Sequence, residues 1–388
     1  MKFRPACTVL LLLLIPTTTA LGGEKVRFAT FNSSLNRNTA GGLREELDGG
    51  SSEQARKIAE ILQRVRPDVV LLNEVDYDSS GTTLQLFRQH YLEVSQGGQQ
   101  PLRYEHSFLA PVNTGIPSGM DLDGNGTTGQ PADAFGFGRF PGQYGMLVLS
   151  RYPIDERQAR TFQLFPWKQM PGGLLPVDQS SGKPYYPAAA RAVFRLSSKS
   201  HWDLPVRIGE TTVHLLASHP TPPVFDGPED RNGRRNHDEI RLWTDYIHPF
   251  RGNYLVDDQG RKGGLPRGEH FVIAGDLNAD PLDGDTVPGA IGQLLGLRRV
   301  NSGQIPASRG AVAFRDTGVN ANHRGNPRND TADFPDRGPG NLRVDYVLPS
   351  RSLQIVKSGV FWPPDGDPTA ALLDASDHRL VWVDVMIK

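Results

Sequence analysis

The sequence predicts a mixed α/β protein in which two β-sheets pack face to face and helices cover their outer sides. Short apolar stretches typical of strands outnumber the helical patterns along the chain, and we find no internal repeat. Several of these strands also end in a polar or charged residue, as strands do where a sheet opens to solvent. The strand ends are therefore the places to look for chemistry.

The N-terminal residues have the layout of a secretory signal. Lys2 and Arg4 precede an apolar run over residues 9–15, and small residues follow up to Gly22. The run is too short to span a bilayer. We expect residues 1–22 to be a signal peptide cleaved near Gly22, and the mature chain to be exported to the periplasm or beyond the cell.

The single cysteine has no place in the expected mature chain. Cys7 lies before the apolar run, so it is no lipid attachment site, and it leaves with the signal. Disulfides and thiol catalysis are thereby excluded, and the protein must depend on a large core. No other stretch is apolar enough for a membrane helix, and we expect residues 23–388 to form one domain.

The charge balance is slightly acidic. The formal net charge is -1, and loss of the two positive charges of Lys2 and Arg4 makes it -3. Tight non-specific binding of nucleic acid, which needs a basic surplus, is therefore not favoured. The run "RNGRRNHDEIR" at 231–241 is basic, and such a run is usually a solvated helix face.

The first strand and helix are clear. Residues 25–31, "KVRFATF", alternate as a strand and stop at Asn32. A helix follows a Gly-rich loop, with Ser51 or Ser52 as its cap, one apolar face, and Pro67 at its end.

The next strand, "DVVLLNEVD" at 68–76, is almost wholly apolar and terminates in Glu74. Further strands are expected at 104–110, 144–150, 191–197, 212–218, 270–275, 342–348 and 378–387, with a helix from about Arg235 to Ile247. Three stretches rich in Gly, Pro, Asn and Asp, at 95–142, 251–268 and 301–341, are expected to be loop insertions in this domain.

The stretch "VIAGDLNADP" at 272–281 begins as a buried strand and ends in polar groups. In an extended chain Asp276 and Asn278 project from the same face, and Pro281 stops the strand. The pair either faces a site at the strand end or forms a turn in which the two side chains cap their own backbone.

Other polar residues also follow apolar strands. They are Asn32, Glu74, His219 in "ASHP", Asp345 in "RVDYV", and Asp377 with His378 in "SDHRL". The motifs "LLNEVD", "GDLNADP", "RVDYVL" and "SDHRLV" resemble, in kind and order, those of the endonuclease/exonuclease/phosphatase family, which includes DNase I-like nucleases, apurinic endonucleases, sphingomyelinases and inositol-phosphate phosphatases. The likeness runs from Asn32 to His378 and implies a DNase I-like, four-layered α/β sandwich with two mostly antiparallel sheets.

The resemblance implies a divalent cation, usually Mg²⁺ with Mn²⁺ as an alternative. Glu74 matches the family's main metal ligand, and Asn32 and Asp377 match its helpers. Hard oxygen ligands of this kind suit Mg²⁺. From the residues alone, Glu74 could instead make a turn contact, and an asparagine after a strand, like Asn32, is a frequent turn residue.

The resemblance also implies catalytic roles. Asp276 matches the aspartate that positions or deprotonates the attacking water, and Asn278 the asparagine that holds this water or a phosphoryl oxygen. His378 would bond the phosphoryl oxygen, with Asp345 keeping its imidazole oriented and protonated. His219 would protonate the leaving oxygen. Alternatively, "HPTPP" at 219–223 is only a rigid turn.

"DLDGNG" at 121–126 matches the opening of a calcium loop. Asp121, Asp123 and Asn125 would supply oxygens, but the twelfth position is Ala132 rather than glutamate. A weak additional Ca²⁺ site that uses Asp133 and a plain Asp/Gly turn are both open.

"SSKSHWD" at 197–203 has two interpretations. Lys199, His201 and Trp202 could form part of a substrate wall. A hairpin loop with a half-buried tryptophan is the favoured one.

These observations predict an exported, divalent-metal-dependent phosphoesterase, favoured as a phosphodiesterase, in which activated water attacks phosphorus in line. Its substrate would be a phosphate ester. Extracellular nuclease activity and phospholipid cleavage are alternatives, the latter with "FGFGRF" at 135–140 as an apolar contact. An alternative of another class is a non-catalytic, calcium-supported binding protein on the same fold.

Overall fold

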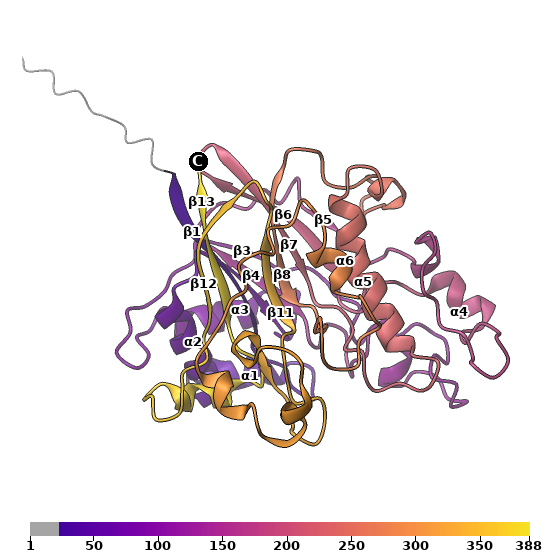
Figure 1. Ribbon diagram of the computed structural model, residues 1–388, viewed down its shortest axis with the longest axis horizontal. Helices are drawn as coiled ribbons and strands as arrows, with labels where there is room; N and C mark the ends of the chain where they lie inside the picture. Colours follow the sequence, from indigo (N-terminus) through magenta and orange to yellow (C-terminus); the bar gives the residue numbers. More distant parts are fainter. Residues whose placement is uncertain (1–22) are drawn as a thin grey trace, which may run out of the picture.

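The computed structural model describes residues 23–388, and the predicted signal peptide lies outside the described residues (Figure 1). Within the described part of the chain, no helix is long and apolar enough to cross a membrane. The described part of the chain starts and ends side by side, because its first strand pairs antiparallel with its last.

The first sheet has six strands in the order β12-β13-β1-β2-β4-β3. Their bounds are β1 (Glu24–Asn32), β2 (Val69–Asn73), β3 (His106–Phe108), β4 (Met146–Ser150), β12 (Gln354–Val360) and β13 (Val381–Ile387). Only the β1–β2 pair is parallel.

The second sheet has five strands in the order β11-β8-β7-β6-β5. Their bounds are β5 (Arg160–Thr161), β6 (His201–Ile208), β7 (Thr211–Ser218), β8 (His270–Asp276) and β11 (Asp345–Pro349). Again one pair, β7–β8, is parallel. Two short strands, β9 (Ala332–Asp333) and β10 (Asn341–Leu342), form a separate ribbon.

Alternating side chains divide the core into layers. In β1, Val26 and Phe28 face the second sheet, whereas Ala29 and Phe31 face the helices on the outer side. In β8, Val272 contributes to the core between the sheets. Its neighbours Phe271 and Ile273 pack on the opposite side against α5 and α6.

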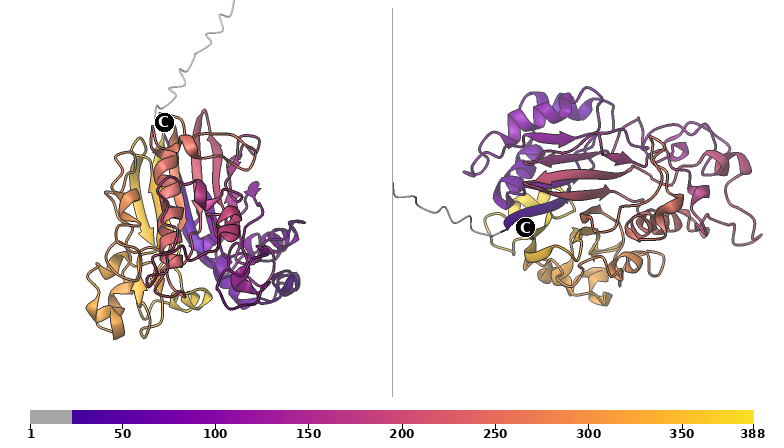
Figure 2. Two further views of the ribbon diagram at one scale, coloured as in Figure 1. Left: turned by 90° about the vertical axis from the view of Figure 1, so that its right-hand side faces the viewer. Right: turned by 90° about the horizontal axis from the view of Figure 1, so that it is seen from above.

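Helices cover both outer faces, so the predicted four-layered sandwich of two packed sheets is confirmed (Figures 1 and 2). The helices are α1 (Gly42–Asp48), α2 (Glu53–Val65), α3 (Thr82–Phe87), α4 (Ala188–Val193), α5 (Arg231–Ile247) and α6 (Gly292–Leu295). As predicted, Ser52 caps α2, accepting a hydrogen bond from the Ala55 amide at 3.2 Å.

Two predicted elements are wrong. Residues 191–197 are not a strand, because α4 occupies the first three of them. The rest of the segment is extended and buries Phe194 and Leu196 against α5. Within the described residues, its β-pairing is an isolated bridge at Arg195. Tertiary packing therefore overrides the strand-like composition.

Residues 197–203 are not a hairpin loop with a half-buried tryptophan. Strand β6 begins at His201, and Trp202 is fully buried between the sheets, edge-on to Phe108 with ring centroids 5.1 Å apart. The sequence analysis also missed β5, β6, β9, β12 and the short helices, and it started α5 four residues late.

The three insertions are mostly irregular. Residues 95–142 contain only β3 and one short 3-10 turn, and residues 251–268 contain another. Residues 301–341 hold three 3-10 turns and the β9–β10 ribbon, and they lie below the sheets in Figure 1 (orange).

Burial makes His201 sensitive to acid. Its ring contacts the Ser197 hydroxyl at 2.7 Å and the Glu239 carbonyl at 2.9 Å, and burial lowers its pKa to about 4. In the unfolded chain the His201 imidazole binds a proton below about pH 6.5, whereas in the folded chain it binds one only near pH 4. Stability is therefore lost as pH falls through this window.

We predict that His201→Gln reduces the stability lost between pH 7.5 and pH 5 by about 2 kcal/mol relative to the unmodified protein. Urea unfolding at both pH values measures the difference. His90→Gln, at a half-buried histidine, is the control and should leave the pH dependence unchanged. Equal losses for His201→Gln and the unmodified protein would contradict this assignment.

Candidate active site

The ends of the strands meet at one edge of the sandwich. Because β1 and β2 are parallel, and β7 and β8 are parallel, the polar residues that follow each pair lie at the same edge. A groove of about 440 Å³ opens there. Of the predicted site residues, Glu74, Asp276, Asn278, Asp377 and His378 line the groove. The other three, Asn32, His219 and Asp345, lie behind this lining and contact it.

Asp276 is the centre of the contacts. Its Oδ2 accepts a hydrogen bond from Asn32 Nδ2 at 3.1 Å and lies 3.4 Å from His219 Nε2 and 3.6 Å from His378 Nε2. Burial opposes its ionisation, but the charge of His378 and the bond from His219 hold the pKa of Asp276 below its ordinary value. Asp276 is therefore a buried carboxylate at neutral pH.

The stretch "GDLNADP" combines a turn with side chains that line the groove. Asp276 Oδ1 accepts a hydrogen bond from the Asn278 backbone amide at 2.9 Å, so the turn forms. The other oxygen of Asp276, which Asn32 bonds, faces the two histidines. Asn278 has a φ of 51° and donates from Nδ2 to the Pro220 carbonyl at 3.1 Å. The turn thus orients the carboxylate.

His378 forms a buried pair with Asp345. Its Nδ1 lies 2.9 Å from Asp345 Oδ2, which also accepts a hydrogen bond from the Thr331 hydroxyl at 2.9 Å. Burial raises the pKa of Asp345 to about 6. Burial alone would lower the pKa of His378, but Asp345 and Asp276 raise it to about 10. At pH 7 the pair is a carboxylate and an imidazolium whose Nε2 faces the groove.

His219 is placed behind Asp276. It is almost fully buried, and its Nδ1 has no hydrogen-bond partner among residues 23–388. Burial, with the charge of Lys199, lowers the pKa of His219. The structure joins His219 to Asp276 rather than to the groove wall, so its role as proton donor stays a prediction.

Glu74 presents the groove with a carboxylate held by two amides. Asn32 Nδ2 donates to Oε1 at 3.2 Å and Asn36 Nδ2 donates to Oε2 at 2.9 Å. Glu74 has a φ of 60°, a left-handed conformation that is strained for a glutamate. The backbone therefore turns this side chain out of the strand and into the groove.

The donor set fits a divalent cation. Asn32 Nδ2 lies between the carboxylates of Glu74 and Asp276 and bonds both, so two acidic groups converge on one amide. Oxygen donors of this kind are those that Mg²⁺ takes from proteins. Asp377 is exposed at the rim, where the Ser34 hydroxyl approaches its Oδ1 at 3.5 Å. It lines the same groove as Glu74.

Three supporting residues were missed from the sequence. Asn36 holds Glu74, Thr331 holds Asp345, and Asn73 Oδ1 accepts a hydrogen bond from the Asp276 amide at 3.2 Å. Asn73 stood inside the motif "LLNEVD", which was a usable signal. Asn36 and Thr331 lie in irregular segments without any pattern that marks them.

The predicted calcium loop gathers three carboxylates. Asp121, Asp123 and Asp133 can place one oxygen each within 4.8 Å of one another. Most of these oxygens already accept local hydrogen bonds: Asp121 from Gly124, Asn125 and Gly126, and Asp133 from Leu122 and Gln130. The arrangement is that of a turn closed by its own side chains.

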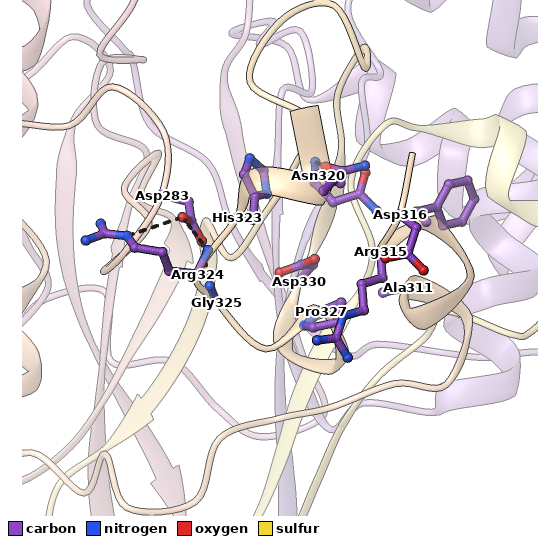
Figure 3. Close-up of a pocket in the computed structure, with 13 residues that line it drawn as sticks. Asp283, Ala311, Arg315, Asp316, Asn320, His323, Arg324, Gly325, Pro327 and Asp330 are labelled. Atoms are coloured by element: carbon purple, nitrogen blue, oxygen red, sulfur yellow. Dashed lines mark hydrogen bonds and ion pairs between the residues drawn. The ribbon is translucent and has the colours of Figure 1, made fainter. Parts of the chain in front are cut away.

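A separate polar cavity of about 220 Å³ lies within the 301–341 insertion and beside Asp283 (Figure 3). Asp330 points into it and makes no side-chain hydrogen bond or ion pair with any residue of the described range. Burial, with the nearby charges of Asp280 and Asp283, raises the pKa of Asp330 to about 8. Its next neighbour, Thr331, is the residue that bonds Asp345.

Comparison with known proteins gives a family match over most of the chain. Residues 29–378 match the model of the Endonuclease/Exonuclease/phosphatase family. No curated protein sequence matches the chain.

Three solved structures have a similar arrangement, each with a TM-score of 0.48. An endonuclease/exonuclease/phosphatase from Beutenbergia cavernae is 17% identical, over 94% of this chain and 72% of that one. A beta toxin mutant from Staphylococcus aureus with bound magnesium ions is 15% identical, over 94% and 100%. Sphingomyelinase C from Streptomyces griseocarneus is 16% identical, over 93% and 99%.

We predict that Asp330→Asn stabilises the protein at pH 8 by about 1–3 kcal/mol, because a buried unpaired carboxylate is replaced by a neutral amide. The raised pKa means that stability from Asp330 is lost as pH rises from about 4 to 8, so the gain should shrink toward pH 4. Urea unfolding across this range measures it. Asp316→Asn, at an exposed residue of the same cavity, is the matched control. A less stable Asp330→Asn would show that the carboxylate has a bound partner.

Proposed function

The chain belongs to the Endonuclease/Exonuclease/phosphatase family, and on that premise we propose that it is a divalent-metal-dependent phosphodiesterase. Members of this family have a phosphoesterase fold. The observation that carries the proposal is the contact of the Asp276 carboxylate with Asn32, His219 and His378 at the floor of one groove. The carboxylate base Asp276, the His378 imidazolium and the proposed metal ligand Glu74 therefore line the same groove.

Hydrolysis would proceed by attack of water on phosphorus in line with the leaving oxygen. Asp276 accepts a hydrogen bond from the attacking water and receives its proton as the new P–O bond forms. Since the pKa of Asp276 is low, its larger contribution is to orient the water. The old P–O bond breaks with its electron pair on the leaving oxygen, which then takes a proton. His219 is the proposed donor of that proton.

His378 would donate a hydrogen bond from Nε2 to the phosphoryl oxygen that gains negative charge. Asp345 keeps the imidazole charged and fixed by holding Nδ1. Asn278 lines the groove beside Asp276 and is proposed to hold the water or a phosphoryl oxygen.

Glu74, Asn32 and Asp377 would hold the cation, for which Mg²⁺ is proposed and Mn²⁺ is an alternative. When bound, such a cation supplies Lewis-acid stabilisation of charge on the phosphoryl group. A weak Ca²⁺ site at Asp121, Asp123 and Asn125 is a separate proposal, and calcium titration of the protein's thermal stability would test it.

We also propose that the protein is exported, since residues 1–22 have a signal layout. Nucleic acid is the less favoured substrate. Besides the slight net negative charge, three further carboxylates line the groove, from Asp280, Asp283 and Asp285, and would repel a polyanion. A binding protein without activity is the minority alternative, because the groove retains every residue that the chemistry needs.

We predict that the purified protein hydrolyses bis(p-nitrophenyl) phosphate with Mg²⁺ and stops in EDTA. His378→Ala should lower kcat by about 10²–10³-fold, as removal of one charge-stabilising donor does in other enzymes. Release of p-nitrophenolate measures the rate. His270→Ala, at the opposite end of β8, is the matched control and should keep full activity. No turnover with Mg²⁺, Mn²⁺ or Ca²⁺ on this diester or on its monoester would sink the proposal and favour the binding protein.

We predict that Asp345→Asn makes activity sensitive to alkaline pH. The unmodified His378, with its pKa near 10, stays protonated to about pH 9. Without the Asp345 charge this pKa falls, so the imidazolium is lost as pH rises through the lower value. The kcat/KM of Asp345→Asn should then decline between about pH 7 and 9, where that of the unmodified enzyme is level. Parallel pH profiles for the two proteins would refute the role of the pair.

A further inference from the structure

A second cavity, of about 570 Å³, adjoins the catalytic groove. The two share Glu74, Pro222, Val224 and Phe225 as lining residues, so a molecule bound at Glu74 can extend from one into the other. We call this cavity the ring chamber. Of the residues predicted for catalysis and for the divalent cation, the proposed metal ligand Glu74 alone lines it.

Aromatic side chains dominate the ring chamber. The rings are those of Phe137, Tyr144, Tyr186, Phe194 and Phe225. Two of them are unusually open for phenylalanine, with Phe225 87% and Phe137 59% exposed. Exposed rings that face one hollow from separate loops favour a ligand that covers them.

The backbone holds two of these rings in strained positions. Tyr144 has a φ of 56° and Phe225 a φ of 66°, in the left-handed region that bulky residues rarely adopt. Phe225 follows Pro222, Pro223 and Val224, and the fixed φ angles of the prolines limit the freedom of this segment. Strain of this kind persists where the surrounding structure fixes a functional geometry.

Two buried polar groups face the same space without a partner. Lys199 is 6% exposed, and its side-chain ammonium makes no hydrogen bond or ion pair with any residue from 23 to 388. The Thr221 hydroxyl is buried and likewise unpaired among those residues. Both residues line the chamber. Groups of this kind need a ligand that brings a negative charge and a hydrogen-bonding atom.

We propose that the ring chamber binds a planar heteroaromatic ring carried by the phosphoester substrate. The rings of Phe137 and Phe225 would cover the faces of this ring, and Thr221 would bond a heteroatom at its edge. Lys199 would face the negative charge of the attached phosphate. Nucleobases and synthetic heteroaryl groups share this chemistry. The inference rests on the proposed function, because the ring must be joined to the phosphate that lies at Glu74.

An aliphatic chain fits the chamber less well. Besides small alanine and proline side chains, only Leu122 and Val224 add aliphatic surface, and a hydrocarbon chain would leave the Thr221 hydroxyl unpaired. Arg235 also stacks on Phe194, with the guanidinium 4.6 Å from the ring centroid, and so keeps that wall flat and polar at its edge.

The test is a set of phosphonates. In these compounds a P–C bond replaces the P–O ester bond, so the enzyme cannot hydrolyse them. Methylphosphonate, 2-naphthylmethylphosphonate, 2-quinolinylmethylphosphonate and decylphosphonate are titrated into the protein with Mg²⁺ by calorimetry. We expect both ring compounds to bind at least about tenfold more tightly than methylphosphonate, and the quinoline compound to bind most tightly. Tightest binding of decylphosphonate, or equal binding of all four, would overturn the proposal.

Variants locate the effect. Phe225→Ala and Phe137→Ala should each remove most of the ring preference, whereas Phe250→Ala, at a ring 70% exposed and outside the chamber, should keep it. Thr221→Val should weaken the quinoline compound and leave the naphthyl compound unchanged. Variants that retain the unmodified preference would contradict the assignment of the chamber.

The calorimetric result is independent of turnover. If the protein is inactive on diesters but still prefers the ring compounds, the proposed function fails and ring binding stands. If the protein hydrolyses diesters in a metal-dependent way but shows no ring preference, only the further inference fails.

Discussion

The buried carboxylate of Asp276 ties the two sheets together at the edge where the groove opens. It stands at the end of β8 in the second sheet, yet its backbone amide bonds Asn73 and its side chain bonds Asn32, both at strand ends of the first sheet. A buried carboxylate is tolerated only where it is fully bonded, so this position requires polar partners from both sheets. The same requirement draws His219 and His378 to Asp276. The geometry of the site therefore depends on this one charge, while the apolar core between the sheets holds them together.

The strand ends bear the strain that this arrangement demands. Glu74 directly follows β2, and Asn278 lies just beyond the end of β8. Both residues adopt left-handed backbone conformations. Each turn redirects the chain while its side chain enters the groove. A relaxed continuation of either strand would point the next side chain along the sheet rather than across its edge. Such conformations cost free energy, which the well-packed layers on either side offset.

The sequence allowed the layered fold and the convergence of site residues to be predicted, because both follow from local patterns. An apolar strand that ends in a carboxylate is visible in one segment, as in the residues before Glu74 and Asp276. What remained hidden depends on partners far along the chain. Trp202 is buried because β6 pairs with β7 and packs on Phe108, and Thr331 matters only because its insertion returns to Asp345. Residues 191–197 looked like a strand, but within residues 23–388 no neighbouring strand lies beside them to complete a ladder.

The two large insertions give the groove walls of opposite character. The 95–142 insertion contributes Phe137 and Leu122 to the apolar ring chamber. The 301–341 insertion lays Phe334 edge-on to His378, with ring centroids 5.3 Å apart, while the Asp333 amide bonds the Asp377 carbonyl at 2.8 Å. The second insertion therefore positions His378, the proposed catalytic histidine, as well as enclosing the groove. Between these walls the acidic lining disfavours a long polyanion, and the aromatic chamber offers a place for one bulky group. For the proposed activity, both features favour a small phosphodiester over a polymer as substrate, because a compact ligand brings only one charge into the acidic groove.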